Sequence, residues 1–594
     1  MKTLSFAFKK GIVDFGKVVV VSSLEIEGEM NELSYSLDGI TYFEEEIRLT
    51  NGCLNLENLV CRYLKVGEAK VIKAYQGNGY IGVEDNDYTS LFITKKGWMG
   101  GDGLFTFNLF NNRDFLPEKT RTLAVFGDTF VNTRGQDDSR LDPWLMPHNS
   151  YAIIEGNSTK KESISFHVKQ GEKGNYLSYL EPDNPLSKEG TMASNLASYN
   201  LPYEIGPYLS SYDPKEDIRL RFRFGNKYFI DKVEIENYFL ADPKGVGYAN
   251  RGIKKLTILL DGEKEKEIEL KKAASLHDTQ SISINKECSS IDFVIPHENG
   301  IGNYGGVNGD EGLFGLNKVR FYSKGHLLID VEADSNSELS IQDKGAWFWL
   351  QDGIILNGRF YSLPIVGKSD LSQPEGFQFR VEGVSLVSLP IVNHYPDFDN
   401  VSQKATNLYG KYGSVTYLYG AGILDNQKKD GYIYVYGYLS DDKHLENGKE
   451  LVVARTKDFA NTNEYEFYDG SQFCKDITKA KPLLNHVSCE LSVFPHCDKY
   501  ICIFTLNVQS PFVAYALSDT PYGPFGPIRV AYVAPPNLCP HQYDYNAKGH
   551  LHLSNEREIL VSYNVNTSNL DENLAIASTY GPRFIRLVYQ EEEK

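Results

Sequence analysis

The sequence predicts an all-β protein, and three observations support that prediction. The 594 residues include 39 Tyr, 32 Phe and 51 Gly but only 5 Met, a composition that favours strands and tight turns over helices. Short β-branched and aromatic runs recur along the whole chain, and most are bounded by Gly, Asn or Asp. Long apolar stripes with a 3.6-residue period are absent from the sequence. The length corresponds to about four domains, or fewer if one is a large β-architecture.

The acidic charge of the chain limits its partners. Its 61 basic and 79 acidic residues give a formal charge of −18, which argues against nucleic acid, because phosphates require a basic face. A neutral, polyhydroxylated ligand such as a carbohydrate suits an acidic, Tyr-rich protein better. We expect no membrane contact, because no segment approaches the ~20 apolar residues needed to cross a bilayer.

The N-terminus and the cysteines indicate a reduced, cytoplasmic protein. The opening run MKTLSFAFKKGIVDFGKVVVV is interrupted by charged residues and shows no cleavage site, so no signal peptide is visible, although a removed leader would leave the same pattern. Eight cysteines are too few for a disulfide scaffold, and no C-x-x-C pair occurs. We expect free thiols and no cofactor; a structural calcium and the oligomeric state, including a homo-oligomer, are left open.

The first 75 residues alternate strand-like and turn-like segments. KVVVVSSLEIEG is a β-branched run, SLDGITYF has the form of a hairpin turn, and CRYLKV has the form of a closing strand. We therefore expect a small β-sandwich-like module over residues 1–75.

Residues 169–328 have a different character from the chain on either side. They contain the strand-like segments FGNKYFIDKVEI, LTILLDG, SSIDFVI and GLNKVRFYS; KEKEIELKKAASLH fits a helical turn or a strand equally well. In this order the segments resemble a discoidin-like (coagulation factor 5/8 type C) galactose-binding jelly roll, and residues 1–75 echo a shorter version of it. The alternative is that both are structural β-sandwich spacers.

Five segments outside this insertion each place a strand beside Gly or Asp, as the blades of a β-propeller do. They are GWMGGDGLFTFNL, WFWLQDGIILNGRFYSLPI, YGAGILDNQKKDGYIYVYGY, CELSVFPHCDKYICIF and PHQYDYNAKGHLHLSNEREILVSYN. The sequence therefore predicts a five-bladed β-propeller formed by residues 76–168, which supply the first blade or blades, and residues 329–590.

The motifs GWMGGDG and FGDTF carry the leading candidates for catalysis. The inner strands of a propeller converge on one axis, so carboxylates distant in sequence face each other there. Glycoside hydrolysis needs two such groups, an acid for the leaving oxygen and a base or nucleophile. Asp102 lies between glycines that let the backbone approach a ligand, and Asp128 ends an apolar strand, where an unpaired acid is costly. The alternative is that each Asp caps a β-turn.

Other acids and aromatic residues extend this candidate site. Glu490 stands among small and apolar residues in VSCELSV, as an inward salt-bridge partner or a further acid or base. Asp352 repeats the Asp-Gly pattern beside Trp347 and Trp349. Because Trp98 likewise lies near an acid, we predict that the three tryptophans stack on sugar rings, with core packing as the alternative for at least one of them.

Three histidines near the C-terminus are further candidates. His550 and His552 alternate in GHLHLS, so they could share one strand face and ligate a metal. Because no carboxylate is spaced with them, we favour hydrogen bonding by His550 near the propeller axis and predict no metal at the site. His541, in PHQYDYN, is a further candidate for contacting substrate.

Taken together, GWMGGDG, FGDTF, WFW-x-x-DG, YGAGILDN, CELS, SDTPYGPFGP and HLHLS resemble the five-bladed β-propeller glycoside hydrolases. The nearest branch is that of the GDG/FGDT propellers, which includes endo-D-arabinanases; arabinanase, arabinofuranosidase and fructosidase propellers are more distant. The resemblance implies that Asp102 and Asp128 form the catalytic pair and that Glu490 is a further acid or a substrate-positioning group. Relatives often have His-Pro-Glu-Leu where this chain has His-Leu-His-Leu, so the acid expected beside His550 is missing.

The leading hypothesis is a glycoside hydrolase that cleaves furanosidic linkages, arabinofuranosyl or fructofuranosyl, in short oligosaccharides. A non-catalytic carbohydrate-binding propeller and a transglycosylase on the same fold are the alternatives. The sequence does not determine which Asp is the nucleophile, or whether the anomeric configuration is retained or inverted.

Overall fold

The computed structural model describes residues 2–111, 115–170, 176–182, 208–210, 213–239, 248–306, 312–328, 331–337, 346–369, 379–462 and 464–591. The chain divides into two compact units. The first contains Met1–Glu181, Phe348–Val366 and Gly383–Lys594, and the second contains Pro182–Trp347 and Gly367–Glu382. The second unit thus begins and ends later than the predicted insertion at 169–328, and it takes in a further short segment.

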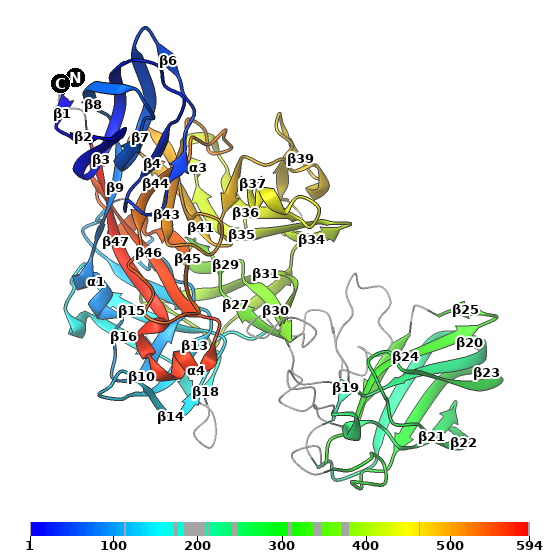
Figure 1. Cartoon of the computed structure of the whole chain (residues 1–594). Helices are drawn as coiled ribbons and strands as arrows, with labels where there is room; N and C mark the ends of the chain where they lie inside the picture. The colour runs from blue at the N-terminus through cyan, green and yellow to red at the C-terminus, as the bar shows by residue number, and fades with distance from the viewer. Residues whose placement is uncertain are drawn as a thin grey trace. The chain divides into compact units, whose positions relative to one another are not determined.

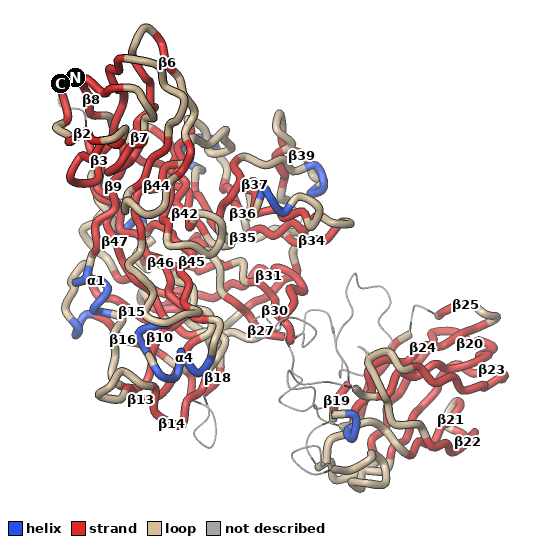
Figure 2. The backbone as a smooth tube through the Cα atoms, viewed as in Figure 1, coloured by secondary structure: helices blue, strands red, loops and turns tan. Residues whose placement is uncertain are grey.

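Five antiparallel sheets of the first unit are the blades of a β-propeller (Figures 1 and 2). From the inner strand outward, blade 1 contains β11 (Phe105–Asn108), β12 (Arg121–Phe126), β15 (Ser150–Glu155) and β16 (Ile164–His167), and blade 2 contains β28 (Gly353–Leu356), β29 (Arg359–Ser362), β31 (Phe379–Val392) and β33 (Ser402–Ala405). In the same order, blade 3 contains β35 (Val415–Asp425), β36 (Ile433–Asp441), β37 (Lys449–Thr456) and β38 (Glu466–Tyr468), and blade 4 contains β41 (Leu491–His496), β42 (Lys499–Thr505), β43 (Phe512–Ser518) and β44 (Arg529–Val533). Blade 5 contains β45 (Gln542–Gly549), β46 (Glu558–Thr567), β47 (Gly581–Gln590) and β9 (Gly79–Glu84). The all-β class and the five-bladed propeller predicted from the sequence are therefore confirmed.

The inner strands of the five blades form a ring. β11 contacts β28, β28 contacts β35, β35 contacts β41, and β41 contacts β45. Blade 5 returns to blade 1 through a hydrogen bond of 2.8 Å between His550 Nδ1 and Thr106 Oγ1. Each of the five Gly- and Asp-punctuated segments of the sequence supplies residues to one of these inner strands, so the local pattern located the axis of the propeller.

The ring is closed by a strand from the beginning of the propeller chain. β9 pairs antiparallel with β47, the last strand, so that Tyr80 lies opposite Tyr589 and Val83 lies opposite Arg586. The sequence pattern groups residues 76–168 with the first blade, whereas β9 completes the last one. Pairing the first and last strands of the propeller removes an open sheet edge, which stabilises the closed ring.

The N-terminal module is a hydrogen-bonded sheet of eight strands. Its strands are β1 (Thr3–Leu4), β2 (Ala7–Lys9), β3 (Ile12–Glu27), β4 (Ser34–Ser36), β5 (Phe43–Glu44), β6 (Leu49–Thr50), β7 (Cys53–Lys65) and β8 (Lys70–Gln76). It packs on blade 4, where Arg529 forms an ion pair of 3.3 Å with Glu45 and the rings of Phe43 and Phe512 lie 5.0 Å apart. The module and the propeller therefore belong to one unit.

The second unit is built on another eight-stranded sheet around a core that includes Phe222, Phe293 and Phe321. Its strands are β19 (Tyr208–Leu209), β20 (Ile218–Asn237), β21 (Lys255–Leu260), β22 (Glu263–Glu269), β23 (Thr279–Ile295), β24 (Gly315–Ser323), β25 (His326–Leu327) and β26 (Glu332–Ser335). The β21–β22 hairpin turns at Asp261–Gly262, where both residues have positive φ, as a two-residue hairpin turn requires. The segment KEKEIELKKAASLH, which fitted a helical turn or a strand equally well, is therefore a strand over the part that belongs to β22.

The remaining elements are short. They are α1 (Asn86–Leu91), α3 (Gln427–Asp430), α4 (Leu570–Ala575), η1 (Lys161–Ser163), η3 (Ala249–Arg251), η5 (Leu445–Asn447), η6 (Ile477–Lys479), η7 (Leu551–Leu553), η8 (Ala577–Thr579), β10 (Lys96–Gly101), β13 (Thr129–Arg134), β14 (Arg140–Leu145), β17 (Lys169–Gln170), β18 (Tyr176–Leu177), β27 (Ala346–Trp349), β30 (Ile365–Ser369), β32 (Tyr395–Pro396), β34 (Tyr409–Tyr412), β39 (Phe473–Cys474) and β40 (Leu484–Val487). Within the described residues no helix is long and apolar enough to span a membrane.

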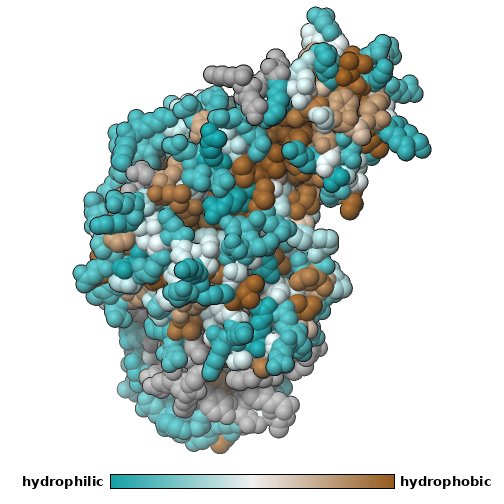
Figure 3. Space-filling view, turned by 90° about the vertical axis from the view of Figure 1, so that its left-hand side faces the viewer, coloured by the Kyte–Doolittle hydropathy of each residue, from teal (hydrophilic) through white to brown (hydrophobic). Residues whose placement is uncertain are grey.

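Polar residues dominate the face seen in Figure 3, where apolar side chains gather in a few patches. All eight cysteines are free thiols.

Candidate active site

Asp102 and Asp128 lie beside each other at the edge of blade 1. Asp102 follows β10 and Asp128 precedes β13, and these two strands pair with Gly101 opposite Thr129. The pairing continues past the strand ends, because Asp102 N donates to Asp128 O at 2.8 Å and Gly127 N donates to Asp102 O at 2.6 Å. The two motifs therefore form one local structure and do not belong to separate turns.

The side chain of Asp102 is held through one oxygen. Its Oδ1 accepts hydrogen bonds from the Tyr545 hydroxyl at 2.6 Å and from Gly103 N at 2.6 Å, and no described residue bonds Oδ2. Burial, together with the nearby Glu490 carboxylate, raises the pKa of Asp102 to about 7, although the Tyr545 hydroxyl opposes the rise. Near neutral pH the Asp102 carboxyl group can therefore either hold a proton or release one.

Asp128 is also held through one oxygen. Its Oδ1 is bonded by His148 Nδ1 at 2.8 Å and by Trp349 Nε1 at 3.1 Å, and among the described residues none bonds Oδ2. Its side chain is 22% exposed. Two donors on Oδ1 fix the orientation of the carboxylate and leave Oδ2 for a ligand.

Glu490 comes from blade 4, directly before the inner strand β41, and reaches the same place. An ideal Cβ built on Gly103 would lie 3.0 Å from Glu490 Oε1, which puts this carboxylate against the backbone next to Asp102. Glu490 Oε2 pairs with the ammonium of Lys548, from the inner strand of blade 5. Burial raises the pKa of Glu490, and Lys548 opposes that rise.

The three carboxyl groups therefore form one acidic cluster, which we define as Asp102, Asp128 and Glu490. Each is anchored by one oxygen and leaves the other without a described partner. Like charges at close range push the affinities for protons apart, so the cluster provides one group that keeps its proton more readily than its neighbours. Such an arrangement can protonate a leaving oxygen and also supply a base or nucleophile.

The tryptophans differ in their surroundings. Trp98 is only 2% exposed; it stacks on Phe166 with ring centroids 4.2 Å apart and donates to Ser150 Oγ at 3.2 Å. Core packing covers the indole ring of Trp98. The prediction that Trp98 stacks on a sugar ring is therefore wrong. Trp347 belongs to the second unit, where it packs against Gly367. Trp349 donates a hydrogen bond from its indole nitrogen to Asp128 of the acidic cluster.

Asp352 and the histidines make structural contacts. Both oxygens of Asp352 accept backbone N–H groups, Oδ1 from Gly353 at 2.8 Å and Oδ2 from Ile423 at 2.6 Å, so Asp352 links blade 2 to blade 3. His541 pairs with Glu572 at 2.7 Å, outside the acidic cluster. These contacts account for the positions of the Asp352 and His541 side chains, and they give neither residue a role in binding a ligand.

The two predicted histidines of HLHL are occupied by hydroxyl groups. His550 is 2% exposed, with Nδ1 on Thr106 and Nε2 on Ser562, both at 2.8 Å. Burial holds its pKa well below the ordinary value. His552 Nε2 bonds Thr122 Oγ1 at 2.9 Å. Because both ring nitrogens of His550 are already bonded, it braces the ring of blades and has no nitrogen left for substrate or metal.

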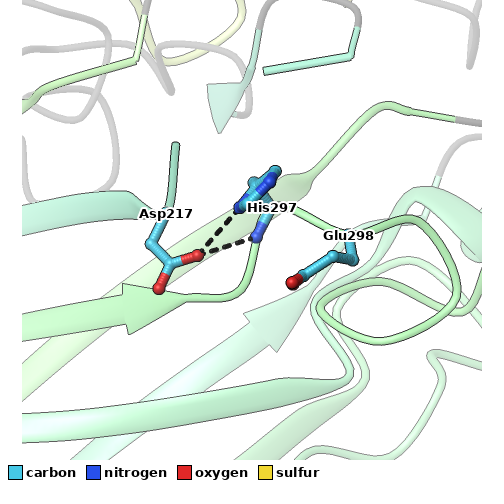
Figure 4. Close-up of side chains that lie close together, drawn as sticks. All are labelled: Asp217, His297 and Glu298. Carbon is cyan, nitrogen blue, oxygen red and sulfur yellow. Dashed lines mark hydrogen bonds and ion pairs between the residues drawn. The ribbon is translucent and has the colours of Figure 1, made fainter. Parts of the chain in front are cut away.

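Among the described residues one group of side chains has metal-ligand composition, and it lies in the second unit (Figure 4). Asp217, His297 and Glu298 place one ligand atom each within 4.8 Å of the others, and His297 Nδ1 already bonds Asp217 Oδ1 at 3.0 Å. Asp217 and Glu298 are exposed, and exposed acidic groups are common without an ion.

Three residues of the site are absent from the candidates that the sequence provides. His148 follows no motif, and its contact with Asp128 depends on strand pairing. Tyr545 and Lys548 lie on the predicted inner segment PHQYDYNAKGH, so their proximity to the axis was foreseeable, but their partners in blades 1 and 4 were not.

Comparisons with known proteins give limited matches. The model of a family described as a domain of unknown function, DUF5005, matches residues 316–589. None of the curated proteins compared with this chain matches it.

Solved structures match over most or about half of the chain. A Bacteroides ovatus protein whose assignment as a hydrolase is provisional is 16% identical, covers 86% of this chain and 90% of its own, and has a TM-score of 0.47. A Penicillium chrysogenum α-L-arabinanase complexed with arabinobiose is 7% identical over 86% and 97% of the two chains, with a TM-score of 0.30. A GH43_1 enzyme from Xanthomonas citri is 16% identical over 46% and 77%, with a TM-score of 0.23. The assignment of the propeller therefore rests on the strand pairing and ring closure of this chain.

Proposed function

We propose that this protein is a glycoside hydrolase that cleaves furanosidic linkages, arabinofuranosyl or fructofuranosyl, in short oligosaccharides. The observation that carries the proposal is the acidic cluster, in which three carboxyl groups from blades 1 and 4 meet, each with one oxygen anchored and one available. The furanoside class comes from the resemblance of the sequence motifs to propeller glycosidases. The chemistry uses side-chain carboxyls alone, so it needs no cofactor.

The environments of the two aspartates suggest their roles. Asp102, with its pKa raised to about 7, is the proton donor to the leaving oxygen, because it retains its proton near neutral pH. Asp128, which is partly exposed and is oriented by His148 and Trp349, is the carboxylate that acts as base or nucleophile. The indole of Trp349 adds an aromatic surface beside this carboxylate.

Hydrolysis of a matched panel of substrates tests the proposal. We would assay 4-nitrophenyl furanosides, the corresponding pyranosides and short furanosyl oligosaccharides. We expect turnover of at least one furanoside and none of its pyranoside counterpart. Asp128→Asn should lower kcat/KM at least about 10²-fold, as expected for loss of a base or nucleophile. Asp519→Asn, at an exposed aspartate outside the acidic cluster, is the matched control.

The alternatives give different results in the same assay. Saturable binding of oligosaccharide without turnover would favour a carbohydrate-binding propeller, and products longer than the substrate would show transglycosylation. Full activity in Asp128→Asn would overturn the role given to that residue. The anomeric configuration of the first-formed product of the unmodified protein, followed by ¹H NMR, separates the two roles of Asp128: retention would identify a nucleophile and inversion a base.

A further inference from the structure

Lys548 is the buried cation of the acidic cluster. Its side chain is 2% exposed, and its ammonium pairs with Glu490 Oε2 and lies 4.1 Å from the centroid of the Phe105 ring. An ammonium is seldom buried so completely unless a carboxylate compensates it. Lys548 joins three blades here, because it comes from β45, Glu490 precedes β41 and Phe105 belongs to β11.

The charges of the cluster are not balanced. Three carboxyl groups lie together, and among the described residues Lys548 is the buried cation in contact with one of them. His148, which bonds Asp128, is 41% exposed at its side chain and is charged only if protonated. The cluster therefore carries more negative charge than its cations neutralise, and a proton retained on one carboxyl reduces the repulsion.

The groups that face Asp102 limit where that proton is held. They are Glu490, Asp128 and the hydroxyls of Tyr543, Tyr545 and Tyr580. Burial raises the pKa of all three tyrosines, so these hydroxyls are neutral in the working range. Glu490 and Asp128 are the charged groups that raise the pKa of Asp102; Glu490 has the larger effect, and it is the one that Lys548 contacts.

The groups that face Lys548 are Glu490, the Phe105 ring and the imidazole of His550. Burial and the neighbouring charge of Lys548 hold the pKa of His550 well below its ordinary value, so its imidazole is neutral. The ammonium of Lys548 thus acts on one ionisable partner, and through that partner on Asp102.

We propose that Lys548 is a positioning residue that holds Glu490 as the carboxylate and thereby assigns the proton of the acidic cluster to Asp102. Lys548 need not touch substrate, because it acts through Glu490. For its catalytic consequence the inference rests on the proposed hydrolase function, but the assignment of the proton is a property of the resting protein. It also explains why Glu490, although buried, is not the donor.

Titration of the carboxyl groups tests this assignment without substrate. The full-length protein would be labelled with ¹³C at the Asp and Glu side-chain carboxyls, and the Asp102 and Glu490 signals would be assigned from Asp102→Asn and Glu490→Gln. In the unmodified protein we expect Glu490 to lose its proton at lower pH than Asp102. In Lys548→Met the Glu490 midpoint should rise and the Asp102 midpoint should fall, each by roughly one pH unit or more, so that their order reverses.

Two further variants keep the test decisive if Lys548→Met folds poorly. Glu490→Gln removes the negative charge beside Asp102 and should lower the Asp102 midpoint while Lys548 stays in place. The double variant Lys548→Met with Glu490→Gln leaves no buried charge unpaired and should show the same lowered midpoint. Lys499→Met, at an exposed lysine that pairs with Asp519, is the matched control and should move neither signal.

The proposal is overturned if Lys548→Met or Glu490→Gln leaves the Asp102 midpoint within about 0.2 pH unit of the unmodified protein, or if Glu490 titrates above Asp102 before any substitution. A kinetic readout then connects the result to catalysis. The basic limb of kcat/KM should move to lower pH in Lys548→Met, whereas a purely structural role would lower kcat/KM without moving the limb. Absence of turnover would contradict the hydrolase function and leave the titration result unaffected.

Discussion

A single methyl group at Gly103 should disable the acidic cluster with little effect on the fold. Gly103 has φ +57°, and an added Cβ would lie 3.0 Å from Glu490 Oε1 and 3.3 Å from Oε2. Both distances are shorter than ordinary contacts, so the Glu490 carboxylate must shift in Gly103→Ala. Left-handed backbone costs an L-residue about 1–2 kcal/mol, and the loss of unfolded-state freedom offsets about 0.4–1 kcal/mol of this cost.

Gly97, in strand β10 shortly before Gly103, provides a matched control. It has φ +85°, and no atom lies within 4 Å of its added Cβ, so Gly97→Ala carries the backbone cost alone. We expect both variants to lose about 1 kcal/mol of stability. Only Gly103→Ala should also lose kcat/KM, by roughly 10- to 100-fold, because small misplacements of reacting groups are that costly.

The assay combines thermal unfolding with kcat/KM on the best furanoside substrate. Equal kcat/KM in Gly103→Ala and Gly97→Ala would refute the reasoning, because it would mean that the position of Glu490 beside Asp102 does not affect the reaction. A much larger loss of melting temperature in Gly103→Ala than in Gly97→Ala would instead show that the Glu490–Lys548 pair cannot move and that the fold absorbs the strain.

Two other predictions concern pH and the tryptophans. Because burial and the Glu490 charge raise the pKa of Asp102 to about 7 from its ordinary value of 3.8, the folded chain keeps a proton that the unfolded chain releases. This contribution to stability is complete below about pH 4 and is lost as the pH rises through 7. Asp102→Asn should therefore raise the melting temperature at pH 8 but not at pH 4, and equal shifts at both values would contradict the raised pKa. Trp98→Ala should cost about 3–5 kcal/mol of stability as a core substitution, whereas Trp349→Phe, which removes the donor to Asp128, should lower kcat/KM about tenfold with a smaller change in melting temperature. The opposite ranking in melting experiments would show that the packing of the two tryptophans is misassigned.

Local patterns in the sequence sufficed for the fold class and for much of its layout. The Asp-Gly turn after LTILLDG became the β21–β22 hairpin, because a two-residue turn with positive φ depends on those two residues alone. Each of the five punctuated segments contributed to one inner strand for the same reason, since strand periodicity and turn chemistry are local properties.

The sequence by itself therefore determined that this is an all-β propeller with candidate acids at its inner strands. Only the tertiary structure decided which acids meet, because Glu490, Lys548 and Tyr545 come from blades that converge after the chain has closed. It also decided between Trp98 and Trp349, which look alike in sequence beside an Asp-Gly pair, yet one is enclosed by Phe166 and Ser150 and the other reaches Asp128. Burial and charge balance are properties of neighbours in space, and in a ring closed by β9 and β47 those neighbours are far apart along the chain.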